Sequence, residues 1–93
     1  RGTFVADEGA SRAVRGGRAS LLSAGVLEVR GEFSAGDPVW IDDESGEHLA
    51  RGLAGFDSEE IPQMLGRTTV QLKRFLGDEY AHPLVHRDNL VLV

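Results

Sequence analysis

The stretch His86-Arg87-Asp88-Asn89-Leu90-Val91-Leu92 decides the fold. It joins a dense polar tetrapeptide to a short apolar run, a pattern typical of a turn that leads into a β-strand. Asp and Asn side chains often hydrogen-bond nearby backbone and so fix turns between strands. We therefore predict a structural turn over 86–89, with strands over 84–86 and 90–93 on its two sides.

A catalytic interpretation of the same residues fails on spacing. In protein kinases a His-Arg-Asp loop supplies an Asp that accepts the substrate proton, and an Asn about four residues later holds a metal ion. Here Asn89 directly follows Asp88. The glycine-rich phosphate loop, the strand Lys and the second metal-binding Asp that such an enzyme also needs are missing. We therefore expect no catalytic residue in this chain.

Working back from this stretch, the sequence alternates short strands with short helices. Asp7 can cap the first helix, and Gly16-Gly17 ends it. Asp57 with Glu60, and Thr68 with Gln71, have the spacing of capping boxes at two further helix starts. The predicted order is a strand over 2–5, a helix over 8–15, strands over 26–30 and 39–41, a hairpin turn over 42–46, a strand over 48–53, helices beginning after 57 and 68, and the closing strands. This order indicates an α+β domain whose small, mostly antiparallel sheet could curl into a barrel.

The spacing of apolar residues also assigns the side chains that face the core. In the 26–30 strand, Leu27 and Val29 are expected to face inward. Trp40 should point to the opposite face from its strand neighbours, and we expect it to pack in a core or against a helix rather than to stack a nucleic-acid base. The helical residues expected to share apolar faces are Ala10, Ala13, Val14, Ile61, Met64, Leu65, Leu72, Phe75 and Leu76.

Composition describes one small globular domain. The 93 residues are 41% hydrophobic and 27% charged, enough for a single core. The chain has no Cys, which excludes disulfides and thiolate metal sites and fits a reducing cytosol. No apolar run approaches the roughly 20 residues of a membrane helix, so no membrane association is expected. Because the chain begins at Arg1 without an initiator Met, we interpret it as a piece of a longer protein.

The charge is unevenly distributed along the chain. The net charge of −5 argues against general affinity for nucleic acid, which needs Lys and Arg at the phosphates. However, four arginines against Glu28 give residues 10–31 a balance of +3, whereas nine acids against Arg51 give residues 32–60 a balance of −8. Arg12 and Arg15 should share an exposed helix face, with Arg18 just beyond it. A solvated surface is the simplest interpretation of both regions.

No residue pattern predicts a metal or a nucleotide. His82 and His86 are four apart, as in helical zinc sites, but Pro83 lies between them and the surrounding pattern is extended. The glycines match neither the phosphate-loop nor the dinucleotide-binding spacing. Ser20 and Ser23 have no identifiable base beside them, so neither is a candidate nucleophile. We therefore predict no metal site and no cofactor site within these residues.

Four blocks, in order, resemble one known family across nearly the whole chain. They are Ser20-Leu21-Leu22-Ser23-Ala24-Gly25-Val26, Gly31-Glu32-Phe33-Ser34-Ala35-Gly36-Asp37-Pro38-Val39, Ala50-Arg51-Gly52-Leu53 and the stretch 86–92. They are similar to the "SLLPxGV", "GxFxxGDxV", "ARGL" and "HRDNLVL" blocks of the C-terminal PUA domain of bacterial glutamate 5-kinases. Ala19 and Ser23 depart from the Lys and Pro often found at those positions.

The resemblance implies a PUA-like β pseudo-barrel with short helices that fills residues 1–93, following an N-terminal amino-acid kinase domain that is absent from this sequence. In such a parent, ATP and Mg²⁺ would serve the kinase domain, in a cytoplasmic enzyme expected to be a homo-oligomer. The PUA domain itself is expected to be non-catalytic and regulatory. The alternatives are an RNA-binding module and a structural domain that assists oligomer assembly. The candidate RNA- or partner-binding residues are Arg12, Arg15, Arg18 and Arg87.

Overall fold

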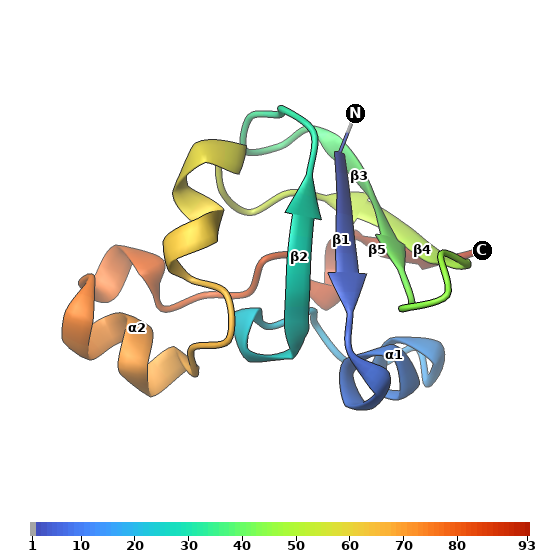
Figure 1. Cartoon of the computed structure of the whole chain (residues 1–93), viewed down its shortest axis with the longest axis horizontal. Helices are drawn as coiled ribbons and strands as arrows, with labels where there is room; N and C mark the ends of the chain where they lie inside the picture. Colours follow the sequence, from blue (N-terminus) through green and yellow to red (C-terminus); the bar gives the residue numbers. More distant parts are fainter. Residues whose placement is uncertain (1) are drawn as a thin grey trace.

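The computed structural model describes residues 2–93, which form one sheet with short helices around it (Figure 1). The strands are β1 (Gly2–Ala6), β2 (Val26–Arg30), β3 (Pro38–Asp42), β4 (His48–Leu53) and β5 (Leu90–Leu92). The α-helices are α1 (Glu8–Arg15) and α2 (Thr69–Phe75). Single turns of 3₁₀ helix are η1 (Ser23–Gly25), η3 (Asp78–Tyr80) and η4 (Arg87–Asn89), and η2 (Ser58–Gln63) is a longer one. The predicted α+β class is confirmed.

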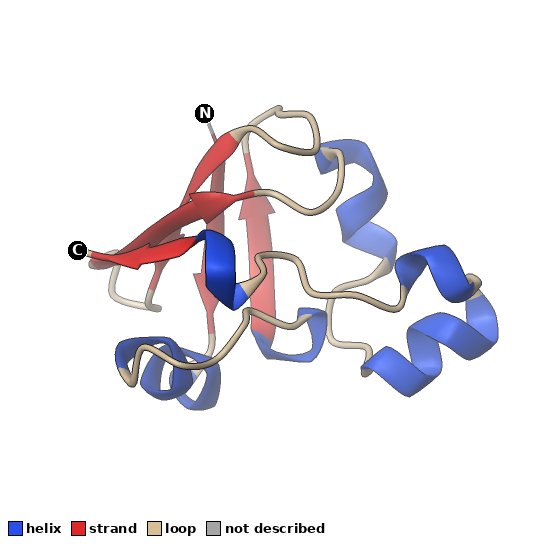
Figure 2. Ribbon diagram, turned by 180° about the vertical axis from the view of Figure 1, so that it is seen from behind, coloured by secondary structure: helices blue, strands red, loops and turns tan. Residues whose placement is uncertain are grey.

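The five strands form a mixed sheet in the order β2-β1-β3-β4-β5. Strand β1 pairs with β3 in parallel, while the other three pairings are antiparallel. The sheet is strongly twisted, so that β4 and β5 run across the direction of β1 and β2 (Figure 2). It does not close into a barrel, because β2 and β5 are edge strands. The predicted small, mostly antiparallel sheet is therefore confirmed, and it is open rather than closed.

The predicted starts of both α-helices, and the predicted end of α1, are confirmed. The Asp7 side chain accepts a hydrogen bond from the Ala10 amide at 2.8 Å, and Gly17 has a left-handed φ of +80° just after α1. At α2, Thr68 and Gln71 make both hydrogen bonds of a capping box. The prediction of a capping box at Asp57 was wrong. The Asp57 carboxylate accepts the amide of Ala35 instead, and the segment is the 3₁₀ helix η2.

The core lies between the inner face of the sheet and the segments that cross it. From the sheet come Phe4, Val39, Ile41 and Ala50, all buried. They pack with residues of the helices and of the 84–85 segment, namely Val14, Leu21, Ile61, Met64, Leu72, Leu84 and Val85. Leu84 and Val85 do not form the predicted strand; a single antiparallel bridge joins Val85 to Leu21.

Three predicted side-chain orientations were wrong. Leu27 is 54% exposed and Val26 is buried instead, because the β1–β2 register shifts between Val5 and Ala6. In α2, Phe75 is 62% exposed while Leu72 is buried. In α1 the buried partner of Val14 is Ser11 and not Ala13, which is exposed. The Ser11 hydroxyl donates a hydrogen bond to the Ala6 carbonyl, so its burial leaves the hydroxyl paired.

Candidate partner-binding surface

The first and last sequence blocks lie side by side, although the residues that join them are more than sixty positions apart in the sequence. The Arg87 amide donates a hydrogen bond to the Ser20 hydroxyl at 2.8 Å. The Leu21 amide donates to the Val85 carbonyl, and the Leu84 amide donates to the Leu21 carbonyl. These bonds fix the position of the 86–89 turn relative to the loop after α1. Of the candidate charged residues, Arg87 therefore has its backbone fixed to the loop that contains Ser20.

The two middle blocks also meet. Pro38 pairs with Leu53 and Val39 pairs with Gly52 between β3 and β4, and the Gly36 amide donates to the carbonyl of Ala54, the residue that follows the third block. A side chain at Gly52 would collide with Val85 and would lie 3.0 Å from the Asn89 carbonyl oxygen. The glycine in the Ala50-Arg51-Gly52-Leu53 block is thus required for close approach of β4 to the last block. All four blocks have structural roles at these junctions.

The turn over 86–89 is structural, as predicted, but different side chains hold it. The His86 ring nitrogen Nδ1 accepts the Asp88 amide at 3.1 Å, and Ser20 holds Arg87 as described. The fixing residues are therefore His86 and Ser20 and not Asp88 and Asn89. The turn presents the Arg87 side chain on the surface, where it is exposed.

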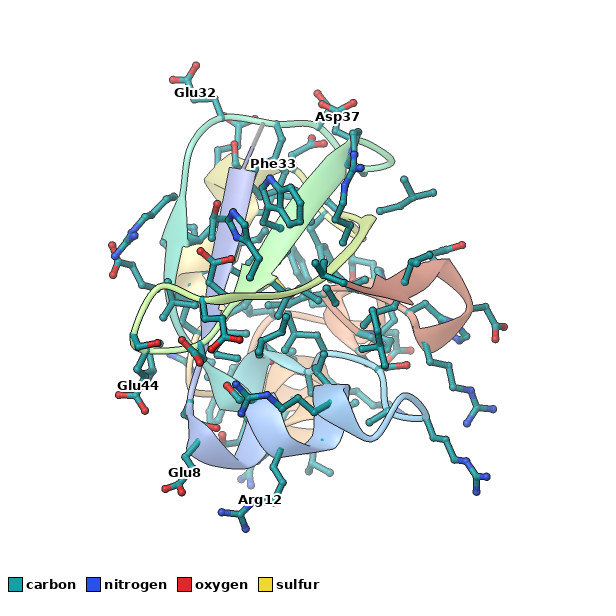
Figure 3. The ribbon with its side chains drawn as sticks, turned by 90° about the vertical axis from the view of Figure 1, so that its right-hand side faces the viewer. Glu8, Arg12, Glu32, Phe33, Asp37 and Glu44 are labelled. Carbon is teal, nitrogen blue, oxygen red and sulfur yellow. The ribbon has the colours of Figure 1, made fainter. Side chains whose placement is uncertain are left out.

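Helix α1 places Arg12 and Arg15 in its last turn, and both are engaged with carboxylates. Arg12 lies 3.1 Å from the Glu8 carboxylate one turn earlier, and both side chains point away from the body of the domain (Figure 3). Arg15 reaches the β3–β4 hairpin, where its guanidinium lies 3.1 Å from the Asp43 carboxylate and 3.9 Å from that of Glu47. A polyanion would have to compete with these acids for both arginines.

Arg18 and Arg87 form a second pair of candidates with different surroundings. Both are exposed, and neither makes an ion pair with any residue from 2 to 93. Arg18 follows Gly17, whose position packs near Leu92 of β5, and Arg87 begins η4 immediately before β5. Of the four predicted arginines, these two are therefore the ones whose charge is uncompensated.

The hairpin acid that pairs with Arg15 has an altered pKa. The Asp43 carboxylate accepts hydrogen bonds from the Ser45 hydroxyl at 2.6 Å and from the Glu47 and Ser45 amides. These bonds, with that of the Ser45 hydroxyl the largest cause and a smaller attraction from Arg15, lower the pKa of Asp43. The lowered pKa favours the charged form of the Asp43 carboxylate, which is the form that pairs with Arg15 of α1.

An aromatic cluster that the sequence pattern did not predict lies on the outer face of the sheet. Trp40 does point away from its buried strand neighbours, as predicted, but this face is the outer one, so the expectation of a core Trp was wrong. The indole stacks on the His48 ring, with centroids 4.0 Å apart, and the Arg51 guanidinium lies 5.1 Å from the Trp40 ring centroid. The hairpin register, which pairs Trp40 with Arg51, was the signal that would have found it.

The histidines considered as metal ligands have separate partners. His82 stacks on Phe56 with centroids 4.1 Å apart, whereas His86 caps its own turn. Between residues 2 and 93, no group of three or more His, Asp or Glu side chains is arranged to hold a metal ion. In the same part of the chain, no helix has the length and apolar character needed to cross a bilayer.

Comparison with known proteins places the chain in a family. The profile of the PUA domain matches residues 2–76. The chain is 84% identical over all 93 residues to glutamate 5-kinase of Bifidobacterium longum (strain DJO10A) and 54% identical to that of Streptomyces avermitilis. In both cases it spans 25% of the length of the enzyme it matches.

Solved structures share the fold. A PUA domain from Aeropyrum pernix K1, crystallised with tartrate, superposes with a TM-score of 0.70 at 29% identity, covering 92% of this chain and 41% of that one. An H/ACA ribonucleoprotein bound to a substrate RNA gives a TM-score of 0.61 at 30% identity, over 72% of this chain and 20% of that one. With the profile match over most of its length, the chain belongs to the PUA domain family.

Proposed function

We infer that this chain is a non-catalytic, regulatory module of a glutamate 5-kinase. The observation that carries this proposal is the 84% identity to a glutamate 5-kinase across every one of the 93 residues. The parent would transfer the γ-phosphoryl group of ATP to the glutamate side-chain carboxylate, with Mg²⁺, as the first step of proline biosynthesis. The chemistry would belong to an N-terminal amino-acid kinase domain of the same polypeptide, in a cytoplasmic homo-oligomer.

A deletion in the full-length protein tests this assignment. The complete enzyme and a version that lacks these residues are compared for glutamate phosphorylation and for sensitivity to proline and Mg²⁺. We expect turnover to persist without the module, because the phosphoryl-transfer groups lie elsewhere, and the response to proline or Mg²⁺ to change. Kinetics that are the same with and without the module would count against a regulatory role. Absence of glutamate phosphorylation by the complete protein would remove the kinase assignment itself.

RNA binding is a second candidate function. It is supported by the similarity to the domain within the RNA-bound H/ACA ribonucleoprotein and by the exposed Arg18 and Arg87. The net charge of −5 and the ion pairs of Arg12 and Arg15 weigh against it. A salt titration of RNA binding distinguishes this candidate, because each phosphate contact adds a defined salt dependence.

A further inference from the structure

The outer face of the sheet carries a continuous row of side chains. Cross-strand partners project to the same face, so the register defines which residues are neighbours there. Arg30, Thr3, Trp40, Arg51 and Val91 pair in turn from β2 across to β5. In the adjacent row Pro38 pairs with Leu53. Viewed from this side, β1 and β3 have no helix in front of them (Figure 3).

The half of this face toward β5 has the chemistry of a protein interface. We define the outer-face patch as Pro38, Trp40, Arg51, Leu53 and Val91. Four of these residues also line a mostly apolar hollow, together with Gly52, Asp88 and Asn89. Trp and Arg are the residues that contribute most to binding in protein interfaces, and charged residues are sparse at interface centres. The patch has one cation, Arg51, and it lies against the indole.

These surroundings favour a protein partner over a nucleic acid. RNA affinity depends on several cations that neutralise phosphates. The outer-face patch offers one guanidinium, which lies over the Trp40 ring, and the Asp88 carboxylate belongs to a residue that lines the same hollow as Arg51. An apolar surface with a complementary carboxylate for Arg51 fits better, because the Arg51 side chain is exposed and a guanidinium can pair with a carboxylate through two parallel hydrogen bonds.

In the relatives, the rest of the same polypeptide offers the matched segment a large protein surface. In glutamate 5-kinases 78% to 84% identical to this chain over its whole length, the matched segment is 25% of the polypeptide. The remaining three-quarters is therefore present at a high effective concentration, which lowers the affinity needed for stable contact. A small domain tethered in this way, with an aromatic sheet face that its own helices leave open, has an occupant available within the same molecule.

We propose that the outer-face patch packs against the remaining part of the same polypeptide, on an apolar surface that receives Trp40 and Val91 and pairs a carboxylate with Arg51. The inference rests on the proposed function, because it takes the chain to be one module of a longer kinase. It goes beyond that function by assigning the surface through which the module acts on its neighbour.

Footprinting of the full-length protein with hydroxyl radicals tests the proposal, because the chain contains matched internal references. Val91 is 70% exposed and Val70, on α2, is 76% exposed. Likewise Leu53 is 42% exposed and Leu22, outside the patch, is 46% exposed. We expect Val91 and Leu53 to be labelled several-fold less than their references. Equal labelling within both pairs would overturn the proposal.

Two charge substitutions identify the occupant. Val91→Glu and Val70→Glu each add one carboxylate to an exposed side chain, so neither is expected to unfold the domain. In the full-length protein, Val91→Glu should restore labelling of Leu53 and increase the radius of gyration, while Val70→Glu should do neither. Protection that rises with protein concentration would indicate a second copy, and protection that requires added RNA would indicate RNA; either result would overturn the proposal. Glutamate phosphorylation, assayed on the same samples, reports separately on the proposed function.

Discussion

At the scale of single residues, substitution of glycine by alanine should have opposite effects on the free energy of unfolding at Gly52 and at Gly9. An Ala side chain at Gly52 would collide with Val85 where β4 packs on the last block. We expect Gly52→Ala to lower the free energy of unfolding by about 1–3 kcal/mol through overpacking. Gly9 lies in α1, where the nearest atom to an added Cβ is an Asp7 oxygen at 3.6 Å.

Gly9→Ala should therefore stabilise the domain by about 0.5–1 kcal/mol, because the helix gains a better helix former without a clash. Urea unfolding of the two variants beside the parent chain measures both changes. A Gly52→Ala variant as stable as the parent chain would mean that β4 and the 84–85 segment can separate without cost, contrary to their close packing at Val85.

The burial of individual side chains could be predicted only where a local pattern decides it. Spacing correctly identified Val14 and Leu72 as buried. It misplaced Leu27, because the bulge that turns this residue outward is a property of the β1–β2 pair. It also misplaced Phe75, whose ring instead lies beneath the guanidinium groups of Arg67 and Arg74. Helical spacing predicts which apolar residues share one face of the helix. How many residues of that face are buried depends on the positions of the neighbouring segments.

At the scale of elements, the Asp43 carboxylate should make the stability of the β3–β4 hairpin depend on pH. The pKa of Asp43 is lowered in the fold by its hydrogen bond from the Ser45 hydroxyl. A lowered pKa means that the stabilisation is present above the unfolded-state pKa and is lost as pH falls through the folded-state value. NMR titration of the carboxyl groups should find the Asp43 pKa below its ordinary value. Ser45→Ala should raise it, whereas the remote Ser34→Ala should leave it unchanged; an unaltered pKa in the first variant would contradict the assignment.

The capping box of α2 makes a second prediction at this scale. The Thr68 hydroxyl accepts the Gln71 amide at 3.2 Å, and the Gln71 side chain accepts the Thr68 amide at 2.9 Å. Thr68→Ala removes one of these bonds and should cost about 1 kcal/mol of unfolding free energy. Thr69→Ala, the same substitution one residue later at an exposed position, should change stability by less than about 0.5 kcal/mol. Thermal unfolding compares them, and equal losses would show that the box does not set the helix start.

Helix starts could be predicted from sequence where the capping bonds are local, as at Asp7 and Thr68. The start at Asp57 could not, although its spacing to Glu60 was suitable. The Asp57 carboxylate binds the amide of Ala35, twenty-two residues earlier in the chain. Where a side chain has one local and one distant possible hydrogen-bond partner, the tertiary structure determines which of the two it binds. The predicted helix accordingly became the 3₁₀ segment η2.

At the scale of the whole molecule, the class of fold was predictable and the topology was not. The order of strands and helices indicated α+β, but the parallel pairing of β1 with β3 joins residues more than thirty positions apart. For the same reason, the sequence could not predict which of the candidate arginines form ion pairs. Their place on the surface follows from local pattern, whereas the contact of Arg15 with Asp43 depends on how α1 sits against the hairpin. This contact separates a compensated pair, Arg12 and Arg15, from the uncompensated Arg18 and Arg87.

The distribution of charge over the whole domain predicts how the affinity for RNA would depend on salt concentration. If Arg12, Arg15 and Arg18 all contact phosphates, the slope of log affinity against log salt should be about −2 to −3. Because Arg18 has no carboxylate partner among residues 2–93, Arg18→Gln should make that slope shallower by about 0.7–0.9. Arg74→Gln removes a cation from α2 and serves as the matched control, with no change expected. Fluorescence anisotropy with single-stranded RNA over a salt series measures all three slopes. Binding that is undetectable or independent of salt would remove RNA as a partner and leave the acidic domain to act through protein contacts.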